Sequence, residues 1–321
     1  MILIVGQNAA WQKACVLPRL RLGEVNRVER VNAFPSSKGI NVGRALGCMG
    51  VPSLVLCYAG GATGELFLRA LREEGLSAEP TPIAGETRIC LTYAEPDGHS
   101  TEVIEPSPRI DAAESAAFRD RFLRDIGGAG ILALMGTLAA GEDEDRYREF
   151  TAEARKRGVA VIMDSAGKPA RRALEAGPEI LKINRTELGE LTGRGVDTAE
   201  KRVEAYRGLR ESYGIRWIFI SHGSHGIEGF DGNRLLQASP PRIQVVNAIG
   251  SGDAACAGIL WRLSGAMGGP ASPSPFDSAQ LFEEALRTAV AMGTANCLNE
   301  VNGRVLPGDF QRVREGVVIS G

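Results

Sequence analysis

The 321-residue sequence has no long hydrophobic run, no polybasic stretch and no CxxC pair. A transmembrane helix needs an apolar run of about 18 residues, so none is predicted. The apolar start at residues 1–5 is too short for a signal sequence and is expected to form a β-strand. The six cysteines are scattered, mostly among apolar neighbours, as reduced core cysteines are. These absences predict a protein of the reducing cytoplasm.

Excess charge of one sign is also missing, since 37 Lys and Arg residues face 39 Asp and Glu residues. The chain therefore has no basic footprint for nucleic acid or an anionic membrane, and a small molecule is the expected partner. The P-loop motif of many nucleotide-binding proteins and the Gly-x-Ser-x-Gly elbow of many hydrolases are absent as well.

Short apolar runs alternate with amphipathic stretches along most of the chain. This order predicts a mainly parallel sheet with helices on both faces, whose ligands bind beyond the carboxyl ends of the strands. The acidic run 142–145 is expected to cap the helix that it opens. The clearest strands are expected at 54–58, 131–135, 159–163, 180–183 and 217–220, and helices at 40–50, 64–74, 143–157 and 198–213.

Two segments interrupt the alternation, at about 9–35 and 86–106. In the second, Pro96-Asp97-Gly98 lies between β-rich runs, which is typical of a hairpin turn. Neither segment is long enough to form a core alone. We therefore expect a single domain over residues 1–321, with both segments forming a small β-sheet lid over its open end. Surface hairpins without a role are the alternative.

A glycine-rich turn, Gly250-Ser251-Gly252-Asp253, joins an extended segment to a helix rich in small residues, which is expected to lie close against the sheet. Unpaired N–H groups at a helix N-terminus attract an anion, and phosphate is the natural ligand. Beside such a site, the Asp253 carboxylate can accept the proton of an attacking hydroxyl. A capping Asp without a catalytic role is the simpler alternative.

Residues 250–255 also match the Gly-x-Gly-x-x-Ala pattern of dinucleotide-binding turns. That pattern requires an acidic residue at the end of a second strand about 20 residues further on. The stretch 265–275, rich in Gly, Pro and Ser, occupies that place instead. A Rossmann-type oxidoreductase is therefore the least favoured function class.

Together with Ser36-Ser-Lys-Gly-Ile-Asn-Val-Gly, the turn resembles the two signatures of the PfkB family of sugar kinases, Gly-Gly-Lys-Gly-x-Asn-Val-Ala and Gly-[Ala/Ser]-Gly-Asp. The resemblance covers essentially the whole chain and implies a doubly wound, three-layer α/β/α ribokinase-like fold with a small β-sheet lid. Within the family, 25–28, 85–88, 101–103 and 242–247 resemble the 1-phosphofructokinase and tagatose-6-phosphate kinase branch. Further family motifs are matched in order by Gly136-Thr-Leu-Ala-Ala-Gly, Lys182-Ile-Asn-Arg-Thr-Glu-Leu and Ile220-Ser-His-Gly-Ser-His-Gly.

The resemblance implies a kinase that uses ATP and Mg²⁺, with K⁺ left open, to phosphorylate a hydroxyl of a sugar phosphate. It also implies a homodimer joined through the lid. Glu187 would contact the metal through water, although Asn184 and Glu187 are also spaced as a helix capping pair. The implied roles are catalysis by Asp253, Gly250, Ser251 and Gly252, acceptor binding by Lys38, Gly39, Asn41, Arg88, Gln12 and Arg27, and nucleotide binding by Asn184, Glu187, Ser221, Gly223, Gly226 and Asn296.

The sequence departs from the family pattern mainly on the acceptor side. Gln12 stands where the family has an Asp that holds sugar hydroxyls, and Ser36 and Ser37 replace two glycines. Ile183 replaces a proline in the third motif. Phosphoryl transfer from ATP is therefore better supported than any named sugar. The alternatives are a kinase for another sugar or a nucleoside, and a nucleotide- or sugar-binding regulator that has lost turnover.

Overall fold

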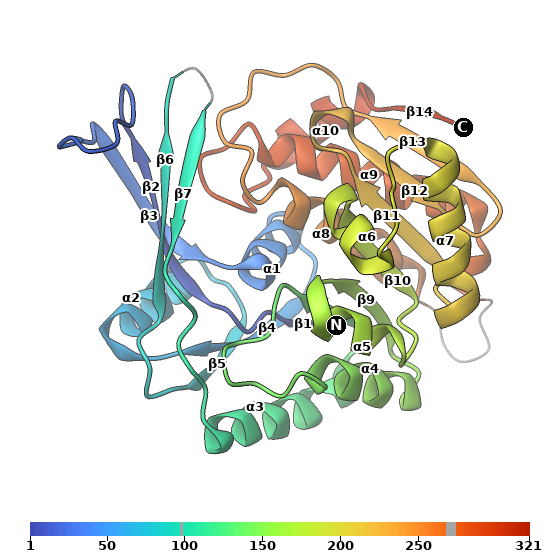
Figure 1. Cartoon of the computed structure of the whole chain (residues 1–321), viewed down its shortest axis with the longest axis horizontal. Coiled ribbons are helices and arrows are strands. Elements are labelled where there is room, and N and C mark those ends of the chain that lie inside the picture. The colour runs from blue at the N-terminus through green and yellow to red at the C-terminus, as the bar shows by residue number, and fades with distance from the viewer. Residues whose placement is uncertain (97–98, 268–273) are drawn as a thin grey trace.

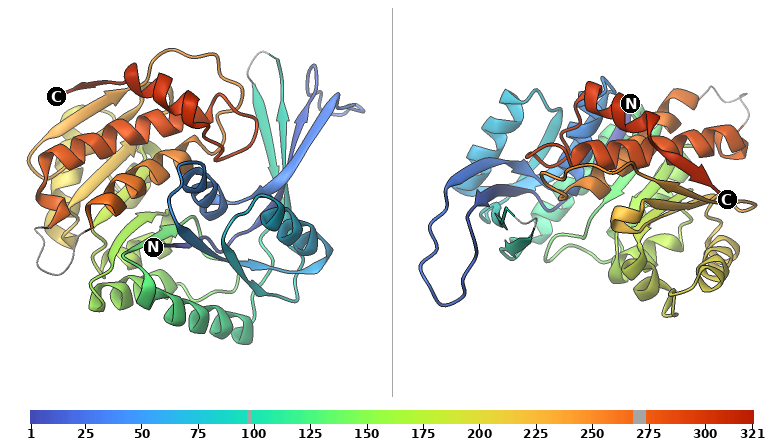
Figure 2. Two further views of the ribbon diagram at one scale, coloured as in Figure 1. Left: turned by 180° about the vertical axis from the view of Figure 1, so that it is seen from behind. Right: turned by 90° about the horizontal axis from the view of Figure 1, so that it is seen from above.

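The computed structural model describes residues 1–96, 99–267 and 274–321, and contains two sheets (Figure 1). Helices cover both faces of the large sheet, and the small sheet stands beside it (Figures 1 and 2). The predicted α/β fold with a small β-sheet lid is confirmed. Among the described residues, no helix is both long and apolar enough to cross a membrane.

Over the described residues, the large sheet has ten strands, in the order β14-β13-β12-β11-β10-β9-β8-β1-β4-β5. Its strands from β5 to β11 are parallel, and β12, β13 and β14 add an antiparallel edge. The bounds are β1 (Ile2–Val5), β4 (Ser53–Ala59), β5 (Ala78–Pro82), β8 (Ile131–Met135), β9 (Ala160–Asp164), β10 (Ile180–Asn184), β11 (Trp217–Ser221), β12 (Ile227–Phe230), β13 (Leu235–Ser239) and β14 (Val318–Ser320).

Two hydrophobic cores lie on opposite faces of this sheet, as the alternation in β1 illustrates. Ile2 and Ile4 point into one core, and Leu3 and Val5 into the other. The first core is closed by α1 (Lys38–Cys48), α2 (Gly61–Glu73), α8 (Ser251–Ala266), α9 (Ala279–Asn296) and α10 (Pro307–Glu315). The second is closed by α3 (Ala112–Asp125), α4 (Arg146–Lys156), α5 (Gly167–Leu174), α6 (Arg185–Thr192) and α7 (Ala199–Tyr213).

The lid is the four-stranded sheet formed by both interrupting segments, in the order β3-β2-β6-β7. Strand β2 lies at its centre and pairs antiparallel with β3 and parallel with β6. The expected hairpin is the antiparallel pair β6 and β7, although 97–98 in its turn lie outside the described residues. The bounds are β2 (Ala10–Val16), β3 (Arg30–Ser36), β6 (Arg88–Ala94) and β7 (Ser100–Ile104).

Two helices begin at other residues than the sequence predicts. α2 begins at Gly61 rather than at 64, and α4 begins at Arg146 rather than at 143. The acidic run 142–145 precedes α4 as expected and Asp145 is the N-cap residue, but its side chain makes no capping bond to the helix. The run begins with Glu142, whose side chain is buried.

Candidate active site

The N-terminus of α8 is shaped by Gly250, the residue before the helix. Its φ angle is +81°, in the left-handed region that favours glycine. A Cβ atom here would lie 3.0 Å from Asn302 Cβ and 3.0 Å from the Gly303 nitrogen. Both the backbone conformation and the lack of space therefore exclude a side chain at this position. As a result, no side chain of residue 250 covers the first N–H groups of α8.

Small residues in α8 permit close packing, though the closest approach differs from the predicted one. A Cβ at Gly258 would lie 2.9 Å from Ala289 Cα of α9, and a Cβ at Gly293 of α9 would lie 2.9 Å from the Ser251 carbonyl oxygen. The tightest helix contact is thus with α9 rather than with the sheet. This packing holds the N-terminal turn of α8 in place.

Asp253 lies in the first turn of α8 and is only 7% exposed. Asn41 Nδ2 in α1 donates a 2.8 Å hydrogen bond to Asp253 Oδ2. Burial raises the pKa of Asp253 to about 6, against the lowering effect of the nearby Lys38 ammonium. A carboxylate of this kind is ionised at neutral pH and still basic enough to take a proton.

Asp164, at the end of β9, joins two lysines from different elements. Lys38 Nζ lies 2.6 Å from Asp164 Oδ1, and Lys182 Nζ of β10 lies 2.6 Å from Asp164 Oδ2. Burial opposes ionisation of Asp164, but the two ammonium groups hold its pKa below the ordinary value. Burial favours the neutral form of Lys182, but the attraction of the Asp164 carboxylate is stronger than this effect, so the pKa of Lys182 is raised. All three groups are therefore charged at neutral pH.

Lys182 also adjoins the glycine-rich turn, because a Cβ at Gly252 would lie only 3.1 Å from Lys182 Nζ. Neither Asp164 nor Lys182 was among the predicted site residues. Both carried a usable signal: Asp164 directly follows a predicted apolar strand, and Lys182 is a cation within another one. A charge at the carboxyl end of a parallel strand is well placed to meet a ligand.

A cavity of about 220 Å³, here named the cationic cavity, opens beside Lys38. Two buried polar atoms in its wall find no hydrogen-bond partner among the described residues, Arg88 Nε and Ser165 Oγ. Such atoms normally find a partner, and an anionic ligand would supply one. The lining residues are Gly6, Asn8, Ser37, Lys38, Arg88, Met135, Gly136, Thr137, Ser165, Ala166 and Glu187.

A second cavity of about 140 Å³, the lid cavity, lies between the lid and the segment that precedes α8. Gln12 is buried in its wall and donates a 2.9 Å hydrogen bond to Thr92 Oγ1. Arg30 of β3 and Glu300 form an ion pair at 2.6 Å. The remaining wall is mainly uncharged, and the lining residues are Gln12, Ala14, Val16, Arg30, Asn32, Thr92, Ala94, Glu95, His99, Ser100, Val245, Val246, Asn247, Ala248, Glu300 and Asn302.

Three of the residues predicted to bind nucleotide line a third cavity of about 550 Å³: Asn184, Ser221 and Gly223. Asn184 also forms a capping box with Glu187 at the start of α6, so the capping alternative holds. Glu187 lines the cationic cavity instead. Gly226 has a φ of +93°, and a Cβ there would lie 2.0 Å from the Ala238 carbonyl oxygen, which makes it a turn residue.

A family model described as pfkB family carbohydrate kinase matches residues 10–303. The chain belongs to this family. Its members transfer a phosphoryl group to an alcohol and use ATP with Mg²⁺. The match spans the lid strands, all residues lining the lid cavity and the N-terminal turn of α8.

Solved structures agree with this membership in fold. Phosphofructokinase-2 from Escherichia coli, in complex with substrates and products, has a TM-score of 0.87 and 25% identity, covering 98% of each chain. A possible 1-phosphofructokinase from Thermotoga maritima has a TM-score of 0.83 at 20% identity, covering 99% of this chain and 98% of that one. A ribokinase from Arabidopsis thaliana has a TM-score of 0.73 at 19% identity, covering 98% of each chain.

Three further predicted site residues do not line any of the three cavities described above, namely Asn296, Gly39 and Arg27. Asn296 is fully buried, donates to the Ile249 carbonyl at 3.0 Å and accepts from the Gly303 nitrogen at 2.7 Å. Its amide braces the glycine-rich turn through the Ile249 carbonyl, and its nucleotide contact stays a prediction. Gly39 allows α1 to approach β1, since a Cβ there would lie 2.9 Å from Gly6 Cα. Arg27 lies in the exposed connection between β2 and β3.

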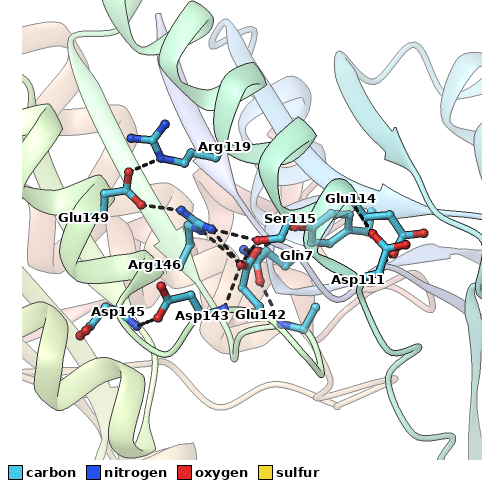
Figure 3. Close-up of polar contacts among 12 residues, drawn as sticks. Gln7, Asp111, Glu114, Ser115, Arg119, Glu142, Asp143, Asp145, Arg146 and Glu149 are labelled. Atoms are coloured by element: carbon cyan, nitrogen blue, oxygen red, sulfur yellow. Dashed lines mark hydrogen bonds and ion pairs between the residues drawn. The ribbon is translucent and has the colours of Figure 1, made fainter.

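The loop after β8, which contributes Gly136 and Thr137 to the cationic cavity, is held by a buried cluster around Glu142 (Figure 3). Glu142 Oε1 accepts a hydrogen bond from Ser115 Oγ at 2.5 Å and one from Arg146 Nε at 3.2 Å. Glu142 Oε2 accepts from Tyr58 OH at 2.8 Å and from Gln7 Nε2 at 3.2 Å. Figure 3 shows Arg146 between Glu142 and Glu149, so the cluster joins α3, α4 and the end of β1.

Proposed function

We propose that the protein is an ATP-dependent kinase for a hydroxyl of a sugar phosphate, of the fructose-1-phosphate or tagatose-6-phosphate kind. The observation that carries the proposal is the buried Asp253 carboxylate at the N-terminus of α8, with the Lys38 ammonium close by. The same region holds the base, an anion-binding helix terminus and fixed cations, which are the parts that phosphoryl transfer requires.

The proposed reaction is a direct transfer. The oxygen of the acceptor hydroxyl attacks the γ-phosphorus of ATP while Asp253 accepts the proton of that hydroxyl. The bond between the γ-phosphorus and the leaving ADP oxygen breaks. The N–H groups of Gly250 and Gly252 would face the developing charge on the transferred group, while the Ser251 N–H group donates to the Ala248 carbonyl oxygen at 3.3 Å. Lys182, adjacent to Gly252, adds a positive charge there. Asn41 orients the carboxylate through its 2.8 Å hydrogen bond.

Magnesium would be held loosely by the protein itself. Among the described residues, no group of three or more His, Cys, Asp or Glu side chains is placed to hold a metal ion. Mg²⁺ keeps several waters and binds through one or two carboxylates and the substrate phosphates, so Glu187 in the wall of the cationic cavity fits such a role through water. When bound, the ion would neutralise the charge of the phosphates.

The acceptor proposal rests on the difference between the two cavities. Arg88 and Lys38 place two positive charges in the wall of the cationic cavity against the one negative charge of Glu187, which suits a phosphate already present on the sugar. The lid cavity is lined mainly by amides, hydroxyls and small apolar groups, which suits the uncharged part of the acceptor. Gln12 offers an amide where the family has a carboxylate, so the pattern of sugar hydroxyls that it accepts is expected to differ.

ADP release is the direct test. The enzyme would be assayed with fructose, tagatose, other ketose and nucleoside acceptors, each phosphorylated and free, with Asp253→Asn as control. We expect turnover with a phosphorylated ketose and its loss in Asp253→Asn. Nucleotide binding without ADP release from any acceptor would favour a regulator, and binding of NAD without ATP would exclude the kinase. Repeating the assay in K⁺ and Na⁺ salts tests potassium activation, since the Escherichia coli relative was crystallised with potassium.

We also propose a homodimer joined through the lid. Strands β3 and β7 are the two edges of the lid sheet, and β7 is exposed along its whole length. Large apolar side chains of the lid are exposed, Leu22, Val25, Val31, Val103 and Ile104. Exposed edges and apolar patches of this kind are normally covered. Analytical ultracentrifugation should show a dimer that Val103→Lys weakens, and a monomer in the wild-type chain would contradict this.

A further inference from the structure

Ser36, the last residue of the lid strand β3, makes a buried contact with the residue that holds the proposed base. It is 5% exposed, and its hydroxyl donates a 3.0 Å hydrogen bond to Asn41 Oδ1. Asn302 Nδ2 lies 3.4 Å from Ser36 Oγ and donates to it. The serine therefore connects the lid, the Asn302 segment and α1 within one hydrogen-bonded group.

The contacts of Asn41 together fix which end of its amide faces Asp253. Asn41 Oδ1 accepts from Ser36 Oγ and, at 3.3 Å, from Arg44 Nη1. The opposite end, Nδ2, then donates to Asp253 Oδ2 at 2.8 Å. A flipped amide would place a carbonyl oxygen against the carboxylate and an N–H group against Arg44, which are two repulsive contacts.

We propose that Ser36 is a positioning residue for the base, acting through Asn41. This rests on the proposed function only in taking Asp253 as the base. A glycine, which the family pattern has at this position, has no hydroxyl and cannot make the contact. The chain thus has an additional donor that holds the Asn41 amide in one orientation and connects the lid strand β3 to the catalytic carboxylate.

The charges around Asp253 determine how a loss of this contact is detected. Lys38 of α1 and Lys182 of β10 favour its ionised form, Asp164 of β9 disfavours it, and the Asn41 hydrogen bond favours it. Removal of the Ser36 hydroxyl leaves the lysines and Asp164 in place. It removes the acceptor of Asn302 Nδ2 and weakens the preference for the Nδ2 end of Asn41 at the carboxylate, so the pKa of Asp253 should rise.

The test is a graded series at this position, Ser36→Thr, Ser36→Cys and Ser36→Ala, with Ser264→Ala at the far end of α8 as the matched control. The pH profile of kcat is measured for each variant. The acidic limb should move up by about 0.5 to 1 pH unit in Ser36→Ala, the size expected from one hydrogen bond. It should move less in Ser36→Cys, and stay in place in Ser36→Thr and the control, with the KM for ATP unchanged.

A second measurement separates this inference from the proposed function. Titration of the Asp253 carboxyl by ¹³C NMR, without substrates, reports the same shift even in a protein that turns over no acceptor. If the wild-type protein forms no ADP with any acceptor, the kinase proposal is overturned. If the titration midpoint of Asp253 is nevertheless higher in Ser36→Ala, the positioning role is retained. A lower melting temperature with unchanged midpoint and unchanged acidic limb would overturn the positioning role.

Discussion

Asn41 Nδ2 donates a 2.8 Å hydrogen bond to Asp253 Oδ2, joining residues 212 positions apart in the sequence. Asn41 belongs to α1, the same helix that supplies Lys38, and Asp253 belongs to α8. The two helices pack against one face of the large sheet, so the proposed base and one of the cations near it are positioned by a shared core. Shifts of either helix would change the distance between base and cation.

Asp253 is predicted to destabilise the fold at neutral pH. Its folded pKa of about 6 exceeds the ordinary 3.8, because burial disfavours the charged form. Between these values the folded state retains a proton that the unfolded state has lost, so stability falls as pH rises, and above about 6 the loss is complete. The gap corresponds to about 3 kcal/mol.

Asp253→Asn should therefore be more stable than the wild type at pH 8 and similar to it near pH 4, while being inactive. Urea denaturation at both pH values measures the difference in unfolding free energy. An equal difference at pH 4 and pH 8 would show that ionisation of this carboxyl is not its cause.

Arg88→Ala should raise the KM of a phosphorylated acceptor by about 10- to 100-fold, because a hydrogen bond to a charged group contributes about 1.5 to 3 kcal/mol. The KM of the corresponding free sugar should change little. Arg69→Ala, on the exposed surface of α2, is the matched control. Equal and small effects on both acceptors would mean that Arg88 does not bind the phosphate.

Much of the fold could be predicted because each element carries its own local signal. The strand over 131–135 is an unbroken apolar run, and the hairpin of the lid has β-rich arms around a turn sequence. The site at Asp253 could be predicted in the same way, because the glycine-rich turn and the acidic residue of the first helical turn are adjacent in the sequence. In these cases the physical cause lies within a few residues.

The remaining features depend on contacts between distant segments. Asp164 meets Lys38 across 126 positions, and no local pattern indicates that pairing. Glu142 has the local sequence of a capping residue, but its buried partners, among them Tyr58 and Ser115, come from other elements. Asn296 has a polar side chain on a helix, yet the turn that it braces precedes it by 47 positions.

Gly250→Ala should abolish measurable activity and destabilise the protein. The left-handed conformation costs an alanine about 1–2 kcal/mol, and contacts at 3.0 Å with Asn302 and Gly303 add to this. The control is Gly208→Ala in α7, where a Cβ meets nothing within 4 Å and helix propensity predicts a gain of about 0.5–1 kcal/mol. Thermal unfolding and ADP release measure both variants, and an active Gly250→Ala enzyme would contradict the proposed anion site.

Glu142→Ala is predicted to be the most destabilising single change outside the cavities. It removes the acceptor of Tyr58, Ser115 and Gln7 and leaves Arg146 buried without one of its two carboxylate partners. Breaking a buried ion pair by removing one partner costs about 3–5 kcal/mol. Glu144→Ala is the matched control, because its side chain is 50% exposed and its ion pairs lie at the surface, where they contribute about 0–1 kcal/mol.

Urea denaturation gives the unfolding free energy of both Glu variants, and acceptor titration gives the KM. Because the Glu142 cluster holds the loop that carries Gly136 and Thr137, the KM of a phosphorylated acceptor should rise in Glu142→Ala even where the variant is fully folded. The KM for ATP should change less. If the free energy of unfolding falls by less than about 1 kcal/mol in Glu142→Ala, as in Glu144→Ala, then water replaces the carboxylate and the cluster does not hold the loop.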